Sequence, residues 1–97
     1  METKIPKTKN EAFAQLDAML SDEEKRELVK SDPIEHHFSL GMWIRNNWIY
    51  KRKEEDLRNL MKQFADHPLD LNMMCYSPDM ASQKIIESYI EHLKENQ

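Results

Sequence analysis

The segment at positions 40–50, LGMWIRNNWIY, constrains the fold more than any other part of this chain. At about 100° per residue, Leu40 and Ile49 fall on opposite sides of a helix, and Trp43 falls between them. A helix that is apolar on nearly all sides is usually buried by neighbours on several faces. We therefore expect a helix at about 35–50 in the centre of the fold.

Helix start signals place the remaining elements around it. Thr8 with Glu11, and Ser21 with Glu24, have the spacing of a capping box, in which each side chain bonds the backbone of the other residue. Pro78 follows a serine and precedes an aspartate, which is typical of the first turn of a helix. The apolar periodicity predicts four further helices, at about 9–20, 22–30, 54–66 and 78–94.

These elements predict an all-α fold, a compact bundle of about five short helices around a central apolar helix. The chain has 97 residues and one glycine, and 39% of it is apolar, which suffices for one small core. Residues 1–8 show no apolar periodicity, so we expect a flexible N-terminus followed by a single helical domain at 9–97. The connection at 67–77 is long, and its sequence leaves open whether it is ordered.

The charge of the chain favours some partners over others. Its formal net charge is −4, which repels nucleic acid and anionic membranes and attracts basic proteins. The basic run at 51–53 is followed at once by three acidic residues, so it resembles a solvated helix junction more than a nucleic-acid patch. The single cysteine, Cys75, fits a reducing compartment, and no apolar run approaches the ~20 residues of a membrane span. We expect a cytoplasmic protein with a protein partner. The sequence leaves open whether the chain also forms homo-oligomers.

Arg45 is the charged residue whose position most needs an explanation. On the predicted helix it lies between apolar side chains and points inward, where a guanidinium without a partner would be costly. Asp79, at the start of the last helix, is the expected partner, and Asn46 and Asn47 are expected to bond backbone in the loop before that helix. We favour a structural clamp between two helices, and a ligand-binding arginine is the alternative.

The aromatic residues of the same segment are candidates for a protein interface. Trp43 and Trp48 lie about 140° apart on an α-helix, so they should not face one groove. We expect one of them in the core and the other partly exposed, with Tyr50 as a third interface candidate. Tryptophan is enriched at interface hot spots, but a core role is the more common one for a helical tryptophan.

The sequence offers little for metal or cofactor chemistry. His36 and His37 are adjacent, which puts them about 100° apart on a helix and makes them poor ligands for one metal ion. No HxxxH, HExxH or CxxC pattern is present, and nothing places a histidine beside Cys75 as the base of a nucleophilic pair. We therefore predict no metal site and no cofactor.

The segment LGMWIRNNW, with SPDMAS and SYIEHL, resembles a family of small bacterial proteins known as a domain of unknown function. The resemblance spans about residues 11 to 93 and implies a shared helical fold, with the arginine and Asp79 in one recurring arrangement. The chain departs from the family pattern at Met80, Ala81 and the Ile49–Tyr50 pair, which argues against a role that needs two adjacent carboxylates. The matching positions are Gly41, Ile44, Arg45, Asn46, Trp48, Pro78, Asp79 and Ser82.

Two classes of function follow. The first is a non-enzymatic interaction module that binds a basic partner, for example as an inhibitor or an immunity-type antidote. The second is a small-molecule, anion-binding or catalytic site around Arg45, His37 and Asp79, in which the arginine binds an anion and the histidine moves protons. We favour the first, because no catalytic motif was found; the polar site residues in either case are Arg45, Asn46, Asp79 and Ser82.

Overall fold

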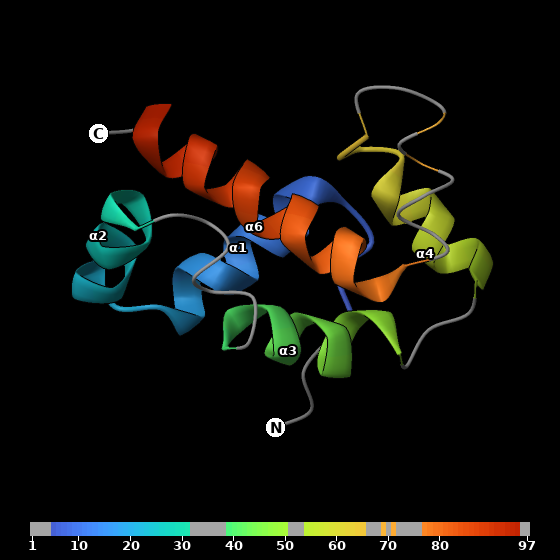
Figure 1. Cartoon of the computed structure of the whole chain (residues 1–97), viewed down its shortest axis with the longest axis horizontal. Helices are drawn as coiled ribbons and strands as arrows, with labels where there is room; N and C mark the ends of the chain where they lie inside the picture. The colour runs from blue at the N-terminus through green and yellow to red at the C-terminus, as the bar shows by residue number, and fades with distance from the viewer. Residues whose placement is uncertain are drawn as a thin grey trace.

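The computed structural model describes residues 5–31, 39–50, 54–65, 69, 71 and 77–95. All regular structure in this part of the chain is helical, which confirms the predicted all-α fold. None of these helices is both long enough and apolar enough to cross a membrane. The elements are α1 (Lys9–Met19), α2 (Asp22–Lys30), α3 (Leu40–Ile44), the π-helical turn η2 (Arg45–Ile49), α4 (Glu54–Met61) and α6 (Pro78–Glu95) (Figure 1).

The two capping boxes are formed as their spacing predicted. The Thr8 hydroxyl accepts from the Glu11 backbone N–H at 3.1 Å, and the Glu11 carboxylate accepts from the Thr8 N–H at 3.2 Å. Ser21 and Glu24 make the same pair of bonds, at 3.1 and 3.0 Å. The backbone and hydroxyl of Ser21 hold the pKa of Glu24 below its ordinary value. Each of the first two helices therefore begins where local chemistry fixes it.

The predicted extent of the fourth helix, 54–66, was wrong at its C-terminal end. The helix α4 ends at Met61, and the chain continues in tight turns in which Gln63 N–H bonds the Leu60 carbonyl and Phe64 N–H bonds the Met61 carbonyl. These turns bury Phe64 and present the Gln63 side chain to α1, where its Oε1 accepts from the backbone N–H of Lys9 at 2.6 Å. A tertiary contact thus replaces the last helical turn.

The N-terminal part of the chain was predicted to be flexible over residues 1–8, and that mobility stays a prediction. Pro6 is nevertheless buried, and the Lys7 backbone N–H donates to the Glu11 carboxylate at 2.6 Å. At the other predicted boundary, residues 35–38 of the central helix lie outside the described residues. So does most of the 67–77 connection.

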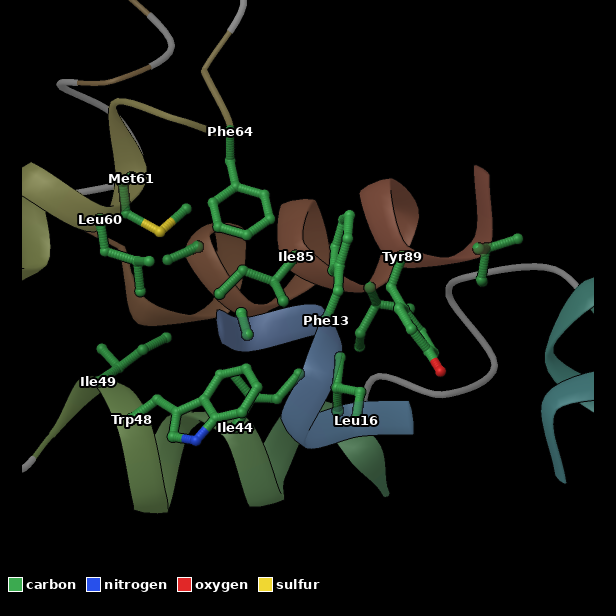
Figure 2. Packing of buried hydrophobic residues seen from close by; sticks show 14 of the residues in the cluster. Phe13, Leu16, Ile44, Trp48, Ile49, Leu60, Met61, Phe64, Ile85 and Tyr89 are labelled. Carbon is green, nitrogen blue, oxygen red and sulfur yellow. The ribbon is translucent and has the colours of Figure 1, made fainter. Parts of the chain in front are cut away.

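The core forms where α1, α3, η2, α4 and α6 meet. Figure 2 shows Phe13 and Leu16 of α1 between the side chains of η2 and those of α6, with Phe64 closing the α4 side. The helix α6 contacts α2, α3 and η2. The centre of the fold is therefore formed by α6 together with α3 and η2. Its buried residues are Ala81, Ser82, Ile85, Ile86, Tyr89 and Ile90.

A polar contact joins three helices beside this core. The Tyr89 hydroxyl on α6 donates to Asp17 Oδ1 on α1 at 2.7 Å, and the Lys25 ammonium on α2 lies 3.6 Å from the same oxygen. Burial, and then the hydrogen bond and negative charge of Asp17, raise the pKa of Tyr89 above its ordinary value. Tyr89 therefore remains a hydrogen-bond donor in the folded protein at pH values where a free tyrosine ionises.

This raised pKa predicts a loss of stability in alkaline solution. Below about pH 10 the tyrosine is protonated in both the folded and the unfolded chain, so its bond to Asp17 contributes fully. Above about pH 10 the unfolded chain ionises first, and the free energy of unfolding falls as pH rises towards the folded pKa. Urea unfolding between pH 8 and 10.5 should show a steeper fall for the wild type than for Tyr89→Phe. Equal slopes would show that Tyr89 is not the group responsible.

Candidate functional site

The guanidinium of Arg45 is almost fully buried between η2 and α6. Its Nη1 donates to the Ser82 hydroxyl at 2.9 Å, and its Nε lies 3.5 Å from the Asp79 carboxylate. The side chain of Arg45 is 7% exposed and that of Asp79 is 68% exposed. The charge of the arginine is thus inside the protein, while its carboxylate partner stands in solvent. The ion pair is therefore weaker than a fully buried one would be.

Ser82 is the partner that lies inside the core. Its side chain is fully buried, and its hydroxyl donates to the Asp79 carbonyl at 3.0 Å, which leaves the oxygen lone pair free to accept from Arg45. The serine therefore links the arginine to the first turn of α6 through a chain of two hydrogen bonds. Three of the four residues predicted for the polar site, Arg45, Asp79 and Ser82, meet in this way.

The remaining asparagines take other positions. Asn46 is exposed, and Asn47 Nδ2 donates to the Trp43 carbonyl at 2.8 Å within its own helix. Most of the loop before the last helix lies outside the described residues, so the expectation that Asn46 and Asn47 bond its backbone stays a prediction. The bond from Asn47 Nδ2 reaches a carbonyl one turn back in its own helix, beside the point where the α-helix gives way to the wider π-turn.

The π-turn also changes the geometry of the two tryptophans. The Tyr50 N–H bonds the Arg45 carbonyl five residues back at 2.9 Å, so the turn is wider than that of an α-helix. The rings of Trp43 and Trp48 are in edge contact, with centroids 5.4 Å apart, a contact that their separation of about 140° on an α-helix did not predict. Trp48 is fully buried, and Trp43 packs against it at the surface of the core. Of the three interface candidates, Trp43 and Tyr50 retain exposed surface.

A hollow of about 500 Å³ lies between α2 and the start of α3, and we call it the apolar hollow. Its apolar side chains come from the end of α1, from α2 and from α3, and Trp43 forms part of it. Three glutamates of α2 stand along it. The described residues that line it are Met19, Leu20, Glu23, Glu24, Glu27, Leu28, Ser39, Leu40 and Trp43. Arg45 and Asp79 do not line it.

The glutamates of the apolar hollow are not equivalent. Glu24 is held by the Ser21 backbone as part of the capping box. Glu23 and Glu27 are exposed and lie four residues apart, so their carboxylates share one face of α2 and repel each other. The sequence contained this spacing, but it gave no sign that apolar groups of α1 and α3 would gather beside it.

A second hollow of about 390 Å³, lined by residues of α1, of the turns after α4 and of α6, is polar. On one side Phe13 stacks on His92 with ring centroids 4.6 Å apart, and the Lys9 ammonium lies 5.7 Å from the Phe13 ring and 5.8 Å from the Phe64 ring. Both signs of charge line it, because its lining includes Lys9 and Lys84 together with Glu91 and Glu95. The mixture selects no single ligand charge.

Several sequence candidates lie outside the described residues: His36 and His37, the basic run 51–53, and Cys75. The proposed approach of His37 to Arg45 therefore stays a prediction. Among the residues that the structure does describe, no group of three or more histidine, cysteine or acidic side chains is arranged to hold a metal ion.

The arrangement around Arg45 predicts different costs for its two partners. Ser82→Ala removes the buried hydroxyl that accepts from Nη1 of Arg45, which should lower the free energy of unfolding by about 1 to 2 kcal/mol. Asp79→Ala removes a solvent-exposed partner and should cost less than about 1 kcal/mol. Urea denaturation of the two variants measures the difference. The reverse order would mean that the carboxylate, not the hydroxyl, holds the guanidinium.

Comparison with known proteins gives a family and no function. A family described as a domain of unknown function (DUF6794) matches residues 5–93 of the chain. No curated protein and no solved structure matches it. The match covers all of the helices described above except the last two residues of α6. The chain is therefore a member of the DUF6794 family, a domain of unknown function.

Proposed function

We propose that this protein is a small non-enzymatic interaction module that binds a basic protein partner through the apolar hollow. The observation that carries the proposal is the combination found there: apolar side chains of three helices beside the carboxylates of Glu23 and Glu27. Apolar surface provides affinity when a partner covers it, and the acidic residues select for cationic groups. The net charge of −4 supports the same partner, since it speeds the approach of a basic protein.

An inhibitor or immunity-type antidote is the form of this function that we favour. Such a protein acts by covering a basic functional surface, and it needs only a rigid complementary face. Trp43 suits this role, because its ring packs on the buried Trp48 and adjoins the apolar hollow. A partly exposed tryptophan whose ring packs on a buried residue is typical of interface hot spots. We expect the protein to act in the cytoplasm.

The alternative, an anion or substrate site at Arg45, has less support. A ligand-binding guanidinium should present its donors to a pocket, whereas Nη1 of Arg45 bonds Ser82 and its Nε faces Asp79. An anion would have to displace the Asp79 carboxylate to reach the same nitrogen. The geometry therefore supports a structural clamp better than it supports a ligand site.

The proposal can be tested by capturing partners from the source cells with three forms of the protein. Glu27→Lys reverses a charge at the apolar hollow. Glu91→Lys is its matched control, because it makes the same exchange four residues after another exposed glutamate, Glu87, on α6. We expect the wild type and Glu91→Lys to retain the same basic protein, and Glu27→Lys to retain several-fold less of it by quantitative mass spectrometry. Equal retention by all three forms, or no retained protein, would contradict the proposal.

A further inference from the structure

We propose that the part of the partner that enters the apolar hollow is an amphipathic α-helix whose cationic side chains lie one turn apart. This inference rests on the proposed function and adds the shape and chemistry of the occupant. Three features of the apolar hollow carry it: the helices that enclose it, the spacing of its carboxylates and the nature of its apolar surface.

The enclosing elements favour an occupant that satisfies its own backbone. The apolar hollow is built by helices α1, α2 and α3, whose backbone groups are bonded within each helix, and the described residues contain no strand edge. At the start of α2 the capping box already bonds the N–H groups of Ser21 and Glu24. An extended peptide would lose water from its N–H and C=O groups there without finding the row of backbone partners that a strand edge provides. A helix brings these groups already paired.

The carboxylates set the spacing of the charges that they attract. Glu23 and Glu27 are four residues apart on α2, which corresponds to a rise of about 6 Å along the helix axis. No ion pair within the described part of the chain engages either carboxylate. Lysine or arginine side chains at positions i and i+4 of a partner helix lying along α2 have the same rise, so each can meet one glutamate.

The apolar surface accepts the anchors of such a helix. An apolar cavity of about 150 Å³ holds a molecule the size of benzene, so about 500 Å³ gives room for roughly three leucine-sized side chains. Met19, which is 40% exposed, and the ring of Trp43 adjoin this space from different helices. Leucines at i, i+3 and i+4 would place three such anchors on one helical face, beside the cations.

The same glutamates make binding separable from folding. Two like charges four residues apart destabilise a helix, and Glu27→Lys converts them into a Glu–Lys pair in the favourable order. This variant should therefore melt at or above the wild-type temperature, by up to about 3 °C. If Glu27→Lys binds its partner more weakly than the wild type does, and its melting temperature is not lower, the loss of binding arises at the apolar hollow and not from misfolding.

The test uses a synthetic 18-residue peptide of leucine, lysine and alanine as the probe. Its leucines occupy one helical face, and its lysines flank them at i and i+4 spacing. Calorimetric titration should show binding to the wild type, together with a change in tryptophan emission from Trp43. We expect about tenfold weaker binding to Glu27→Lys, unchanged binding to Glu91→Lys, and no measurable binding of a peptide with glutamate in place of lysine.

Besides a failure of the probe to bind, two results would overturn the inference. The first is equal weakening by Glu27→Lys and Glu91→Lys, which would mean that the peptide responds only to net charge. The second is equally tight binding of a peptide of the same composition in which leucine and lysine alternate, because that pattern is amphipathic as a strand and not as a helix.

The outcome can be separated from that of the capture experiment. If a basic protein is retained through Glu27 but the helical probe does not bind, the occupant is not a helix and only this inference fails. If the probe binds through Glu27 but the cells yield no retained protein, the proposed function fails, although the apolar hollow recognises such a helix.

Discussion

The packing of α6 against its neighbours is the constraint on which the rest of the structure depends. A chain of 97 residues can bury one small core, and α6 supplies six buried residues to it. Because α2 and α3 each contact α6, this helix sets the space between them. The apolar hollow lies in that space, so the proposed binding surface depends on how α6 holds the two helices.

Polar contacts fix α6 at two places along its length. Near its start, Ser82 accepts from the buried guanidinium of Arg45. About two turns further along the same helix, the Tyr89 hydroxyl donates to Asp17. Asp17 in turn lies beside Lys25 of α2, the helix that carries the glutamates of the apolar hollow. Buried polar groups of this kind add little net stability, but leaving one unpaired is costly, so each contact disfavours other arrangements of the helices.

This division of roles accounts for the distribution of charge. Arg45 donates to Ser82 inside the protein, and its position fits a clamp between helices. The exposed Glu23 and Glu27 of α2 form no ion pair within the described part of the chain, and they lie beside apolar surface. Charges that the fold does not use, next to apolar groups that it does not bury, are what an interaction surface requires.

The sequence by itself determined where most helices begin and what class of fold they form, because capping boxes and apolar periodicity depend on residues three and four apart. It also pointed to Asp79 as a neighbour of Arg45, since a buried guanidinium requires a partner. Tertiary structure alone decided three other features: the end of α4, the π-turn that brings Trp43 against Trp48, and the apolar hollow. Each of these features depends on contacts between side chains that are distant in sequence, or on a widened helical turn. The apolar periodicity of an α-helix, which assumes about 100° per residue, carries information about neither.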